Sequence, residues 1–200
     1  MPVHAITGCM FSGKTEALCL HLRVFLIAEK KVKIFVPVEA KRAARGIDDI
    51  LPNSKIPNTP KAIYFKNPPE ISDLTEKSDQ IIAVDEAQFI NKRKEIEEFL
   101  AVLEKIKKGR DVYVAGLDTD FLHRPWGAMP DVMAVADNIF PKLKAVCMKC
   151  KNLRASCTQR LVKGKPAPKD SPQEAVGDIK PNKDEISYEA RCEDCFEIGK

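Results

Sequence analysis

Hydrophobic positions recur along the chain in two alternating patterns, which together predict a sheet covered by helices. Short apolar or β-branched runs, typical of buried strands, occupy Val3–Thr7, Val32–Val36, Ala62–Phe65, Ile81–Val84 and Val112–Leu117. Two longer segments, residues 14–30 and 91–108, carry apolar side chains at the spacing of one helix face. Strands that alternate with helices favour a parallel sheet. We therefore expect an α/β fold, a mainly parallel sheet flanked by helices.

This pattern changes at two places along the chain. From Val38 to Pro60, charged residues, prolines and asparagines replace the periodicity, which predicts a loop region. After about Val146, paired cysteines bracket a polar stretch that holds four prolines between Pro166 and Pro181. We expect two domains, an α/β domain over residues 1–145 and a small module over residues 146–200 with too few apolar residues for its own core.

The segment between the first predicted strand and the first predicted helix matches a phosphate-binding loop. It reads Gly8-Cys9-Met10-Phe11-Ser12-Gly13-Lys14-Thr15 and fits G-x-x-x-x-G-K-[ST] at each fixed position. The glycines let backbone N–H groups turn toward a polyphosphate, and the following helix N-terminus favours negative charge. Lys14 would reach the β- and γ-phosphates, and the Thr15 hydroxyl would bind Mg²⁺. The alternative is a chance glycine turn before a helix. The match and its flanks predict a nucleoside triphosphate site.

Two adjacent carboxylates, Asp85 and Glu86, follow the apolar run Ile81–Val84. In phosphate-loop enzymes an acidic residue at this strand end holds Mg²⁺ beside the loop's Ser or Thr. Glu86 would reach the same cleft and could accept a proton from an attacking hydroxyl group. The alternative is a pair of exposed carboxylates before a helix. We expect Asp85 to bind magnesium with Thr15 and Glu86 to be catalytic.

Two C-x-x-C pairs, Cys147/Cys150 and Cys192/Cys195, are separated by 41 residues. Two such pairs supply four thiolates for one tetrahedral ion, and Zn²⁺ is the usual occupant of a Cys₄ site. A closed site has no open coordination position, so its role would be structural. The alternatives are unrelated buried cysteines or a redox pair.

Aromatic residues follow the ends of two predicted strands. Phe89, Phe121 and Trp126 would lie at the carboxyl edge of the sheet, where open α/β sheets bind ligands. Flat apolar rings suit a planar base, although such residues are more often part of a core.

Composition and charge narrow the functional classes. The chain of 200 residues is 44% hydrophobic and 31% charged, with a net charge of +4. Its basic residues are scattered rather than arranged in a stripe, so we expect no nucleic-acid partner. No apolar run approaches the roughly 20 residues that span a bilayer, and we expect no membrane partner. Seven cysteines without a recognisable secretion signal favour a reducing compartment, so we expect a cytoplasmic protein.

Taken together, these segments resemble the type II thymidine kinases, the zinc-containing cytosolic family, in its bacterial style. Further matching segments support the resemblance from near residue 3 to near residue 196, with a weak gap between about 38 and 75. They are Asp85-Glu86-Ala87-Gln88-Phe89, Ala115-Gly116-Leu117-Asp118-Thr119-Asp120-Phe121, Arg124-Pro125-Trp126-Gly127, Ala145-Val146-Cys147-Met148-Lys149-Cys150, Thr158-Gln159-Arg160-Leu161 and Ser187-Tyr188-Glu189-Ala190-Arg191-Cys192.

The resemblance implies a RecA-like phosphate-loop core and a zinc-held module whose lasso loop covers a nucleoside. It implies transfer of the γ-phosphate of ATP to thymidine, with Glu86 as the base that activates the 5′-hydroxyl. The lasso backbone around Ala175–Ile179 would bind the base edge. It also implies a homotetramer inhibited by dTTP. The implied ATP-site residues are Gly8 to Thr15, Asp85, Gln88 and Arg42. The implied nucleoside-site residues are Met10, Phe89, Leu117, Phe121, Trp126, Thr158 and Tyr188.

Three departures from the family pattern concern rate and fine specificity. The first is that Ala40-Lys41-Arg42-Ala43 lacks the usual acidic residue. The second is that the loop before the last cysteine pair lacks the glycine pair common in animal members and has Lys180-Pro181 nearby. The third is that Cys9 replaces a proline and Trp126 replaces a phenylalanine. Two other functions stay open. One is a kinase for another nucleoside, such as deoxyuridine or a purine nucleoside. The other is a zinc-ribbon nucleic-acid-binding protein switched by ATP, which the scattered charge disfavours.

Overall fold

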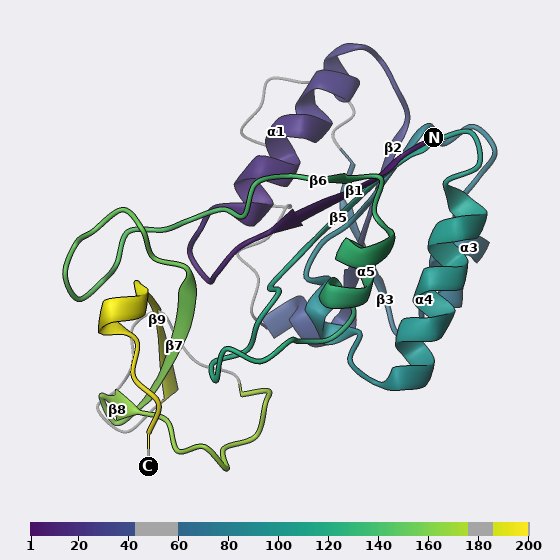
Figure 1. The fold of residues 1–200 in the computed structure, drawn as a ribbon. Coiled ribbons are helices and arrows are strands. Elements are labelled where there is room, and N and C mark those ends of the chain that lie inside the picture. Colours follow the sequence, from purple (N-terminus) through teal and green to yellow (C-terminus); the bar gives the residue numbers. More distant parts are fainter. Residues whose placement is uncertain (43–59, 176–185, 200) are drawn as a thin grey trace.

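The computed structural model describes residues 1–42, 60–175 and 186–199, which form two sheets (Figure 1). The larger sheet has six strands in the order β3-β2-β4-β5-β1-β6, and each of its ladders is parallel. Its strands are β1 (Val3–Thr7), β2 (Val32–Pro37), β3 (Ala62–Phe65), β4 (Ile81–Val84), β5 (Asp111–Gly116) and β6 (Asn138–Ile139). The predicted α/β fold is confirmed. Of the loop expected over Val38–Pro60, residues 43–59 lie outside the described part.

Helices cover both faces of this sheet (Figure 1). The helix α1 packs on one face, and α3, α4 and α5 pack on the other. The α-helices are α1 (Lys14–Ile27), α3 (Pro69–Asp73), α4 (Arg93–Ile106) and α5 (Met129–Val135). Three short 3₁₀ helices accompany them, η1 (Val38–Arg42), η2 (Ala87–Phe89) and η3 (Glu193–Cys195).

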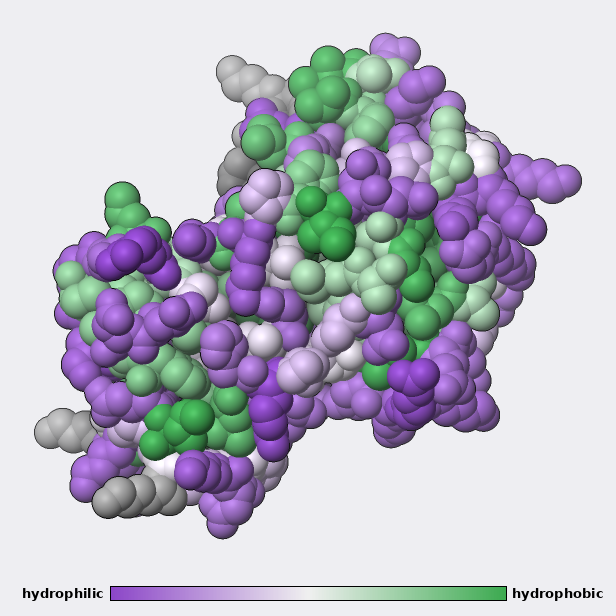
Figure 2. Space-filling model, viewed as in Figure 1, coloured by the Kyte–Doolittle hydropathy of each residue, from purple (hydrophilic) through white to green (hydrophobic). Residues whose placement is uncertain are grey.

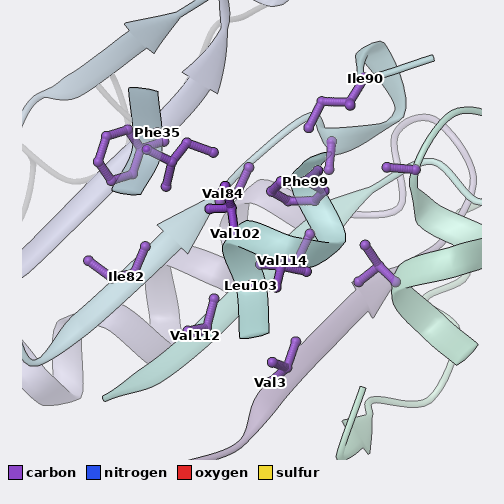
Figure 3. Packing of buried hydrophobic residues seen from close by; sticks show 14 of the residues in the cluster. Val3, Phe35, Ile82, Val84, Ile90, Phe99, Val102, Leu103, Val112 and Val114 are labelled. Atoms are coloured by element: carbon purple, nitrogen blue, oxygen red, sulfur yellow. The ribbon is translucent and has the colours of Figure 1, made fainter. Parts of the chain in front are cut away.

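Successive strand residues point to opposite faces, so each buried strand contributes to two apolar clusters. In β4, Ile82 and Val84 pack toward α4, whereas Ile81 and Ala83 pack toward α1. Figure 3 shows the α4 side, with Phe99 of the helix close to the strand residues beneath it. Every residue of β4 is buried, as expected for a parallel strand covered on both faces.

The helix α1 ends at Ile27, three residues before the predicted end at Lys30. The amide of Glu29 donates to the Leu26 carbonyl, and the amide of Lys30 donates to the Phe25 carbonyl. With Glu29 at a φ of 56°, this is the Schellman arrangement that closes a helix in the left-handed region. The residues that follow, Ala28, Glu29 and Lys30, are all good helix formers, so the sequence held no stop signal there and the predicted length was too great.

The helix α1 also keeps part of its apolar surface uncovered. Leu20, Val24 and Ile27 retain 63%, 64% and 69% of their accessible surface. Figure 2 shows green apolar patches among the purple hydrophilic surface at the end of the molecule where α1 lies. The helix therefore presents apolar side chains on a face that the sheet does not cover.

The sequence patterns did not predict the second sheet, which is small and antiparallel. Its order is β8-β7-β9, and its strands are β7 (Cys157–Val162), β8 (Lys165–Pro166) and β9 (Ile186–Arg191). Small side chains form its buried cluster: Cys9, Ala145, Cys147, Ala155, Ala190 and Cys192. Because Cys9 belongs to the segment after β1, this cluster joins the small sheet to the larger one. The short elements α3, α5 and β6 were also missed.

Candidate active site

The segment that connects β1 to α1 adopts a backbone that only glycine tolerates at two points. A Cβ atom on Gly8 would lie 2.5 Å from the Leu143 carbonyl oxygen, because the chain passes close to that residue. Gly13, directly before α1, has a φ of 80°, which lies in the left-handed region that glycine adopts at little cost. The structure therefore supplies a physical reason for both glycines of the predicted phosphate loop.

Lys14, the first residue of α1, lies folded against this loop. Its Nζ donates to the Cys9 carbonyl oxygen at 2.9 Å, and the residue is only 8% exposed. The ammonium group is thus held above the backbone amides that are expected to face a polyphosphate. To contact a phosphate, the side chain needs only to exchange the carbonyl for a phosphate oxygen.

Thr15 and Asp85 are brought together although 70 positions separate them. The Thr15 hydroxyl donates to Asp85 Oδ2 at 2.9 Å, and the Glu86 amide donates to Asp85 Oδ1 at 2.9 Å. Burial, reinforced by the neighbouring Glu86 carboxylate, raises the pKa of Asp85 to about 7. Hydroxyl and carboxylate oxygens are the ligands that Mg²⁺ accepts, so this pair fits a magnesium ion. A bound cation would favour the ionised carboxylate and reverse the effect of burial on its pKa.

Glu86, which follows Asp85, is held by Gln88. Gln88 is 1% exposed; its Nε2 donates to Glu86 Oε2, and its Oε1 accepts from the Leu117 amide at 3.0 Å. Glu86 itself has a φ of 57°, an unusual value for a residue other than glycine. Such backbone strain is common in active sites. One buried amide therefore joins the end of β4 to the residue after β5 and orients the expected base. Any contact from Gln88 to a phosphate stays a prediction.

Two glycines make room for Gln88. A Cβ atom on Gly127 would lie 1.9 Å from the Gln88 carbonyl oxygen, and one on Gly116 would lie 2.7 Å from Gln88 Oε1. Gly127 also has a φ of 56°. The close approach of these two segments fixes the position of Gln88, a role that motif spacing did not reveal.

Six of the seven residues expected to hold a nucleoside lie in three groups of two. Phe89 and Trp126 form an edge-to-face pair with ring centroids 5.6 Å apart. The Met10 amide donates to Thr158 Oγ1 at 3.0 Å, which joins the phosphate loop to β7.

The third group contains Phe121 and Tyr188, whose rings both contact the Arg160 guanidinium group. Leu117, the remaining expected nucleoside residue, lies beside Gln88. The buried Trp126 Nε1 has no hydrogen-bond partner among the described residues. Because buried polar atoms are normally partnered, this donor is a feature that a ligand or water would satisfy.

Two expectations fall partly or wholly outside the described residues. Arg42 ends η1, and its side chain is not described. Of the expected lasso backbone, only Ala175 is described, and its carbonyl oxygen accepts from the Tyr188 hydroxyl at 2.7 Å. The positions 176–179 lie outside the described residues.

Sequence reasoning missed two buried charged residues near these groups. Asp120, 1% exposed, accepts hydrogen bonds from the Leu122 and Arg124 amides and from the Arg124 and Gln173 side chains. Arg160, 2% exposed, lies in the middle of β7. Arg160 belongs to the quoted segment Thr158-Gln159-Arg160-Leu161, but no pattern in the sequence predicted the strand β7 or the burial of this side chain.

The four paired cysteines converge at the edge of the small sheet. Their Sγ atoms all lie within 4.8 Å of one another, with Cys150 and Cys192 3.6 Å apart. Tetrahedral zinc with Zn–S bonds of about 2.3 Å separates its sulfur ligands by about 3.8 Å, so the cluster fits one ion. Burial opposes ionisation of Cys147, but hydrogen bonds from the backbone of Cys150, Cys192 and Lys149 outweigh it and lower its pKa to about 6. Burial and the neighbouring thiols raise the pKa of Cys192 and raise that of Cys195 to about 12, so a bound cation would be needed to ionise all four thiols.

Comparison with known proteins agrees with this geometry. A model of the thymidine kinase family matches residues 1–196, which is nearly the whole chain. Within the described residues, no helix has the length and apolarity needed to cross a membrane. The chain therefore belongs to the thymidine kinase family, which implies a kinase, and its four-cysteine cluster fits the zinc-containing type II members.

Proposed function

We propose that this protein transfers the γ-phosphate of ATP to the 5′-hydroxyl group of thymidine. One observation carries the proposal: Thr15, Asp85 and Glu86 form a continuous hydrogen-bonded series beside the phosphate loop. The series supports the proposal because the two residues proposed to bind magnesium are adjacent to Glu86, whose backbone amide is the last donor of the series. Family membership supports the same activity.

Each residue of the series has a separate role in the proposed reaction. The backbone of residues 8–13 and Lys14 would hold the polyphosphate, with Lys14 turning from the Cys9 carbonyl to phosphate oxygens. Thr15 and Asp85 would hold Mg²⁺, which supplies positive charge against the phosphates when bound. Arg42 is proposed to add charge near the transferring group.

Glu86 is proposed to act as general base. It accepts the 5′-hydroxyl proton while the bond from O5′ to the γ-phosphorus forms and the bond to the β-phosphate oxygen breaks, releasing ADP. Gln88 keeps the Glu86 carboxylate oriented through its hydrogen bond to Oε2. Met10, Phe89, Leu117, Phe121, Trp126, Thr158 and Tyr188 would enclose the nucleoside, and the cysteine-bound zinc would be structural.

The proposal extends to assembly, regulation and location as the family resemblance implies them. A homotetramer is supported by the exposed apolar side chains of α1, since a contiguous apolar surface often marks an interface. We also propose feedback inhibition by dTTP and a cytoplasmic location. The chain is proposed to form two domains, over residues 1–145 and 146–200. Sedimentation of the purified protein would test the tetramer.

The decisive experiment measures ADP release with thymidine, deoxyuridine and purine nucleosides as acceptors. We expect thymidine to give the highest kcat/KM, and we expect Glu86→Gln to lower kcat roughly 10²–10⁴-fold with little change in ATP affinity. Glu104→Gln, an exposed carboxylate on α4, is the matched control and should retain full activity.

A variant Glu86→Gln that keeps more than about a tenth of the activity would remove the base assignment, since a tenfold loss is only about 1.4 kcal/mol of barrier. Preference for another nucleoside would replace thymidine as substrate. Salt-dependent DNA binding without ADP release would favour the nucleic-acid-binding alternative.

A further inference from the structure

Arg160 is a buried arginine, and each of its three guanidinium nitrogens donates to a neutral oxygen of the described residues. Its Nε donates to the Tyr188 hydroxyl at 2.9 Å, its Nη1 donates to the Pro172 carbonyl, and its Nη2 donates to the Gln173 carbonyl at 2.5 Å. Arg160 belongs to β7, whereas Pro172 and Gln173 belong to the irregular segment after β8. One planar side chain therefore determines where that segment lies.

The same guanidinium group also covers an aromatic ring, that of Phe121, from the segment that follows β5. Its Cζ lies 3.8 Å from the Phe121 ring centroid and 5.3 Å from the Tyr188 ring centroid. Stacking on an aromatic face is favourable for a planar cation and sets the orientation of the ring. Arg160 thus contacts two residues of the proposed nucleoside site, Phe121 and Tyr188, from a position between them.

The segment held by Arg160, residues 172–175, is here named the strap. Further contacts attach it to both sheets. The Gln173 side chain donates to Asp120 Oδ2 at 3.1 Å, and the Asn91 side chain donates to Glu174 Oε1. The Tyr188 hydroxyl donates to the Ala175 carbonyl at 2.7 Å. The strap therefore spans from β7 and β9 to the segments that follow β4 and β5.

The strap also forms one wall of a cavity of about 400 Å³. Pro172, Gln173 and Glu174 line one side, and Phe89 and Asn91 lie among the residues of the other. Of the residues proposed for the nucleoside, Phe89 lines this cavity, and the charged residues Glu39, Lys92 and Glu95 line it as well. Since Arg160 fixes the carbonyls of Pro172 and Gln173, it also fixes the position of that wall.

From these contacts we propose that Arg160 is the positioning residue of the nucleoside site. It holds the Phe121 ring and the strap in a single arrangement, so that the nucleoside binds a preformed site. The proposal rests on the proposed function, and it deepens it by assigning nucleoside affinity to a residue that does not face the phosphates. Lysine cannot replace it, because an ammonium group has neither the planar stack nor the fixed fork of donors.

The test compares Arg160→Lys with Arg110→Lys. Arg110 also makes three hydrogen bonds from its guanidinium nitrogens, to the backbone carbonyls of Asp79, Ile106 and Glu76, but it lies at the opposite end of the larger sheet from the proposed site. Steady-state assays measure KM for thymidine, KM for ATP and kcat. Thymidine affinity is also measured directly by fluorescence, because Trp126 is the only tryptophan of the chain and lies in the proposed site.

For Arg160→Lys we expect thymidine KM and Kd to rise by about tenfold or more, as for loss of charged hydrogen bonds. The KM for ATP should stay within about twofold, because the contacts that Arg160 makes within the described residues involve Phe121, Tyr188 and the strap rather than the phosphate loop. Arg110→Lys should change neither KM. Equal increases in both KM values, or a thymidine Kd within about twofold of wild type, would overturn the proposal.

A second variant keeps the test valid if Arg160→Lys folds poorly. Gln173→Ala removes only the bond between the strap and Asp120, and it should raise thymidine KM by about threefold at unchanged metal content and ATP KM. An unchanged thymidine KM in this variant would count against the strap. A wild-type protein that prefers another nucleoside would contradict the proposed substrate alone, and Arg160 would then be judged by the affinity for that nucleoside.

Discussion

The strands β4 and β7 are both buried, but with side chains of opposite chemistry. In β4 all four residues are apolar and pack between α1 and α4. In β7 the buried residues include Thr158, Gln159 and Arg160, at 3%, 2% and 2% exposed. An apolar side chain gains stability from any well-packed neighbour, whereas a buried polar side chain costs free energy unless it finds a specific partner. Burial of the β4 side chains therefore stabilises the fold in general, whereas burial of the β7 side chains is favourable only with particular hydrogen-bond partners.

The hydrogen-bond partners of the buried polar residues of β7 lie in three different parts of the chain. Thr158 accepts from the phosphate loop at Met10, and Arg160 holds the strap. Gln159 pairs with the backbone of Glu197 in both directions, at 2.8 Å each. The polar strand thus connects the loop, the strap and the C-terminal segment.

The apolar clusters around the two sheets differ in the same way. The two clusters of the larger sheet contain Phe, Ile, Leu and Val residues from strands and helices. The cluster of the small sheet consists of alanines and cysteines. Small side chains bury little apolar area, so we expect the stability of this region to depend on a metal ion bound by the four cysteines. The comparison predicts that substitution of a cysteine in the cluster destabilises the small sheet, whereas substitution of a large apolar residue destabilises the larger sheet.

Removal of the metal should have the largest effect. Chelation, or Cys150→Ser, should abolish amide-exchange protection in β7 and β9 while β4 and β5 stay protected, since structural zinc contributes on the order of 10 kcal/mol. Cys150 is exposed, so its substitution leaves the packing of the clusters unchanged. Thymidine affinity should fall much more than ATP affinity.

The matched control for the metal experiment is Cys19→Ser, a buried thiol packed between α1 and the larger sheet. It should lower overall stability without changing metal content. Elemental analysis should find about one zinc ion per chain in wild type and Cys19→Ser. Freshly reduced protein without metal, or full protection of β7 in Cys150→Ser, would refute the dependence of the small sheet on zinc.

A cavity in the larger core should have the next largest effect. Phe99, 0% exposed on α4, lies over β4 in Figure 3, and Phe99→Ala should lower the free energy of unfolding by about 3–5 kcal/mol. Metal content should stay unchanged, because the cysteine cluster shares no residue with this core. Denaturant titration gives the stability. The control is Phe196→Ala, at a half-buried position, which should lower the free energy of unfolding by less. If Phe99→Ala lost metal as well as stability, the two regions would not be independent.

Substitution of a single polar residue in β7 should have the smallest effect. Gln159→Ala leaves the Glu197 amide and carbonyl without their partners, which should cost about 1–2 kcal/mol. Gln159→Glu keeps the acceptor but loses the donor, so it separates the two bonds. Denaturant titration of metal-loaded protein measures both. Gln159→Ala at wild-type stability would show that water replaces the side chain at no cost.

Most of the larger sheet could be predicted because its signals are local. A run of consecutive apolar residues such as Ile81–Val84 is enough to predict a buried strand. The strands β1, β3 and β4 have the predicted bounds. The small sheet could not be predicted, because three consecutive buried residues of β7, Thr158, Gln159 and Arg160, are polar or charged. Strand β7 has no apolar run, and its partner β9 follows more than twenty residues later. No local period marks such a pair.

In the candidate site, too, some features could be predicted from local sequence patterns and others could not. The spacing of Gly8, Gly13, Lys14 and Thr15 and the position of Asp85 and Glu86 after an apolar run are visible in the chain itself. The bond from Thr15 to Asp85 is not visible there, nor is the clamp of Gln88 between Glu86 and Leu117. These contacts depend on neighbouring strands placing distant residues side by side.

The sequence by itself thus determined the class of fold, the phosphate-loop motif, the carboxylates and the four thiols, because each is a local pattern with a chemical requirement. Only the tertiary structure decided which polar residues are buried and what they hold. Arg160 reads as an ordinary charged residue along the chain, yet folding removes it from water and leaves its donors to the strap and Tyr188. The cost of burying a charge without partners is what makes that arrangement specific, and it arises only once distant segments have met.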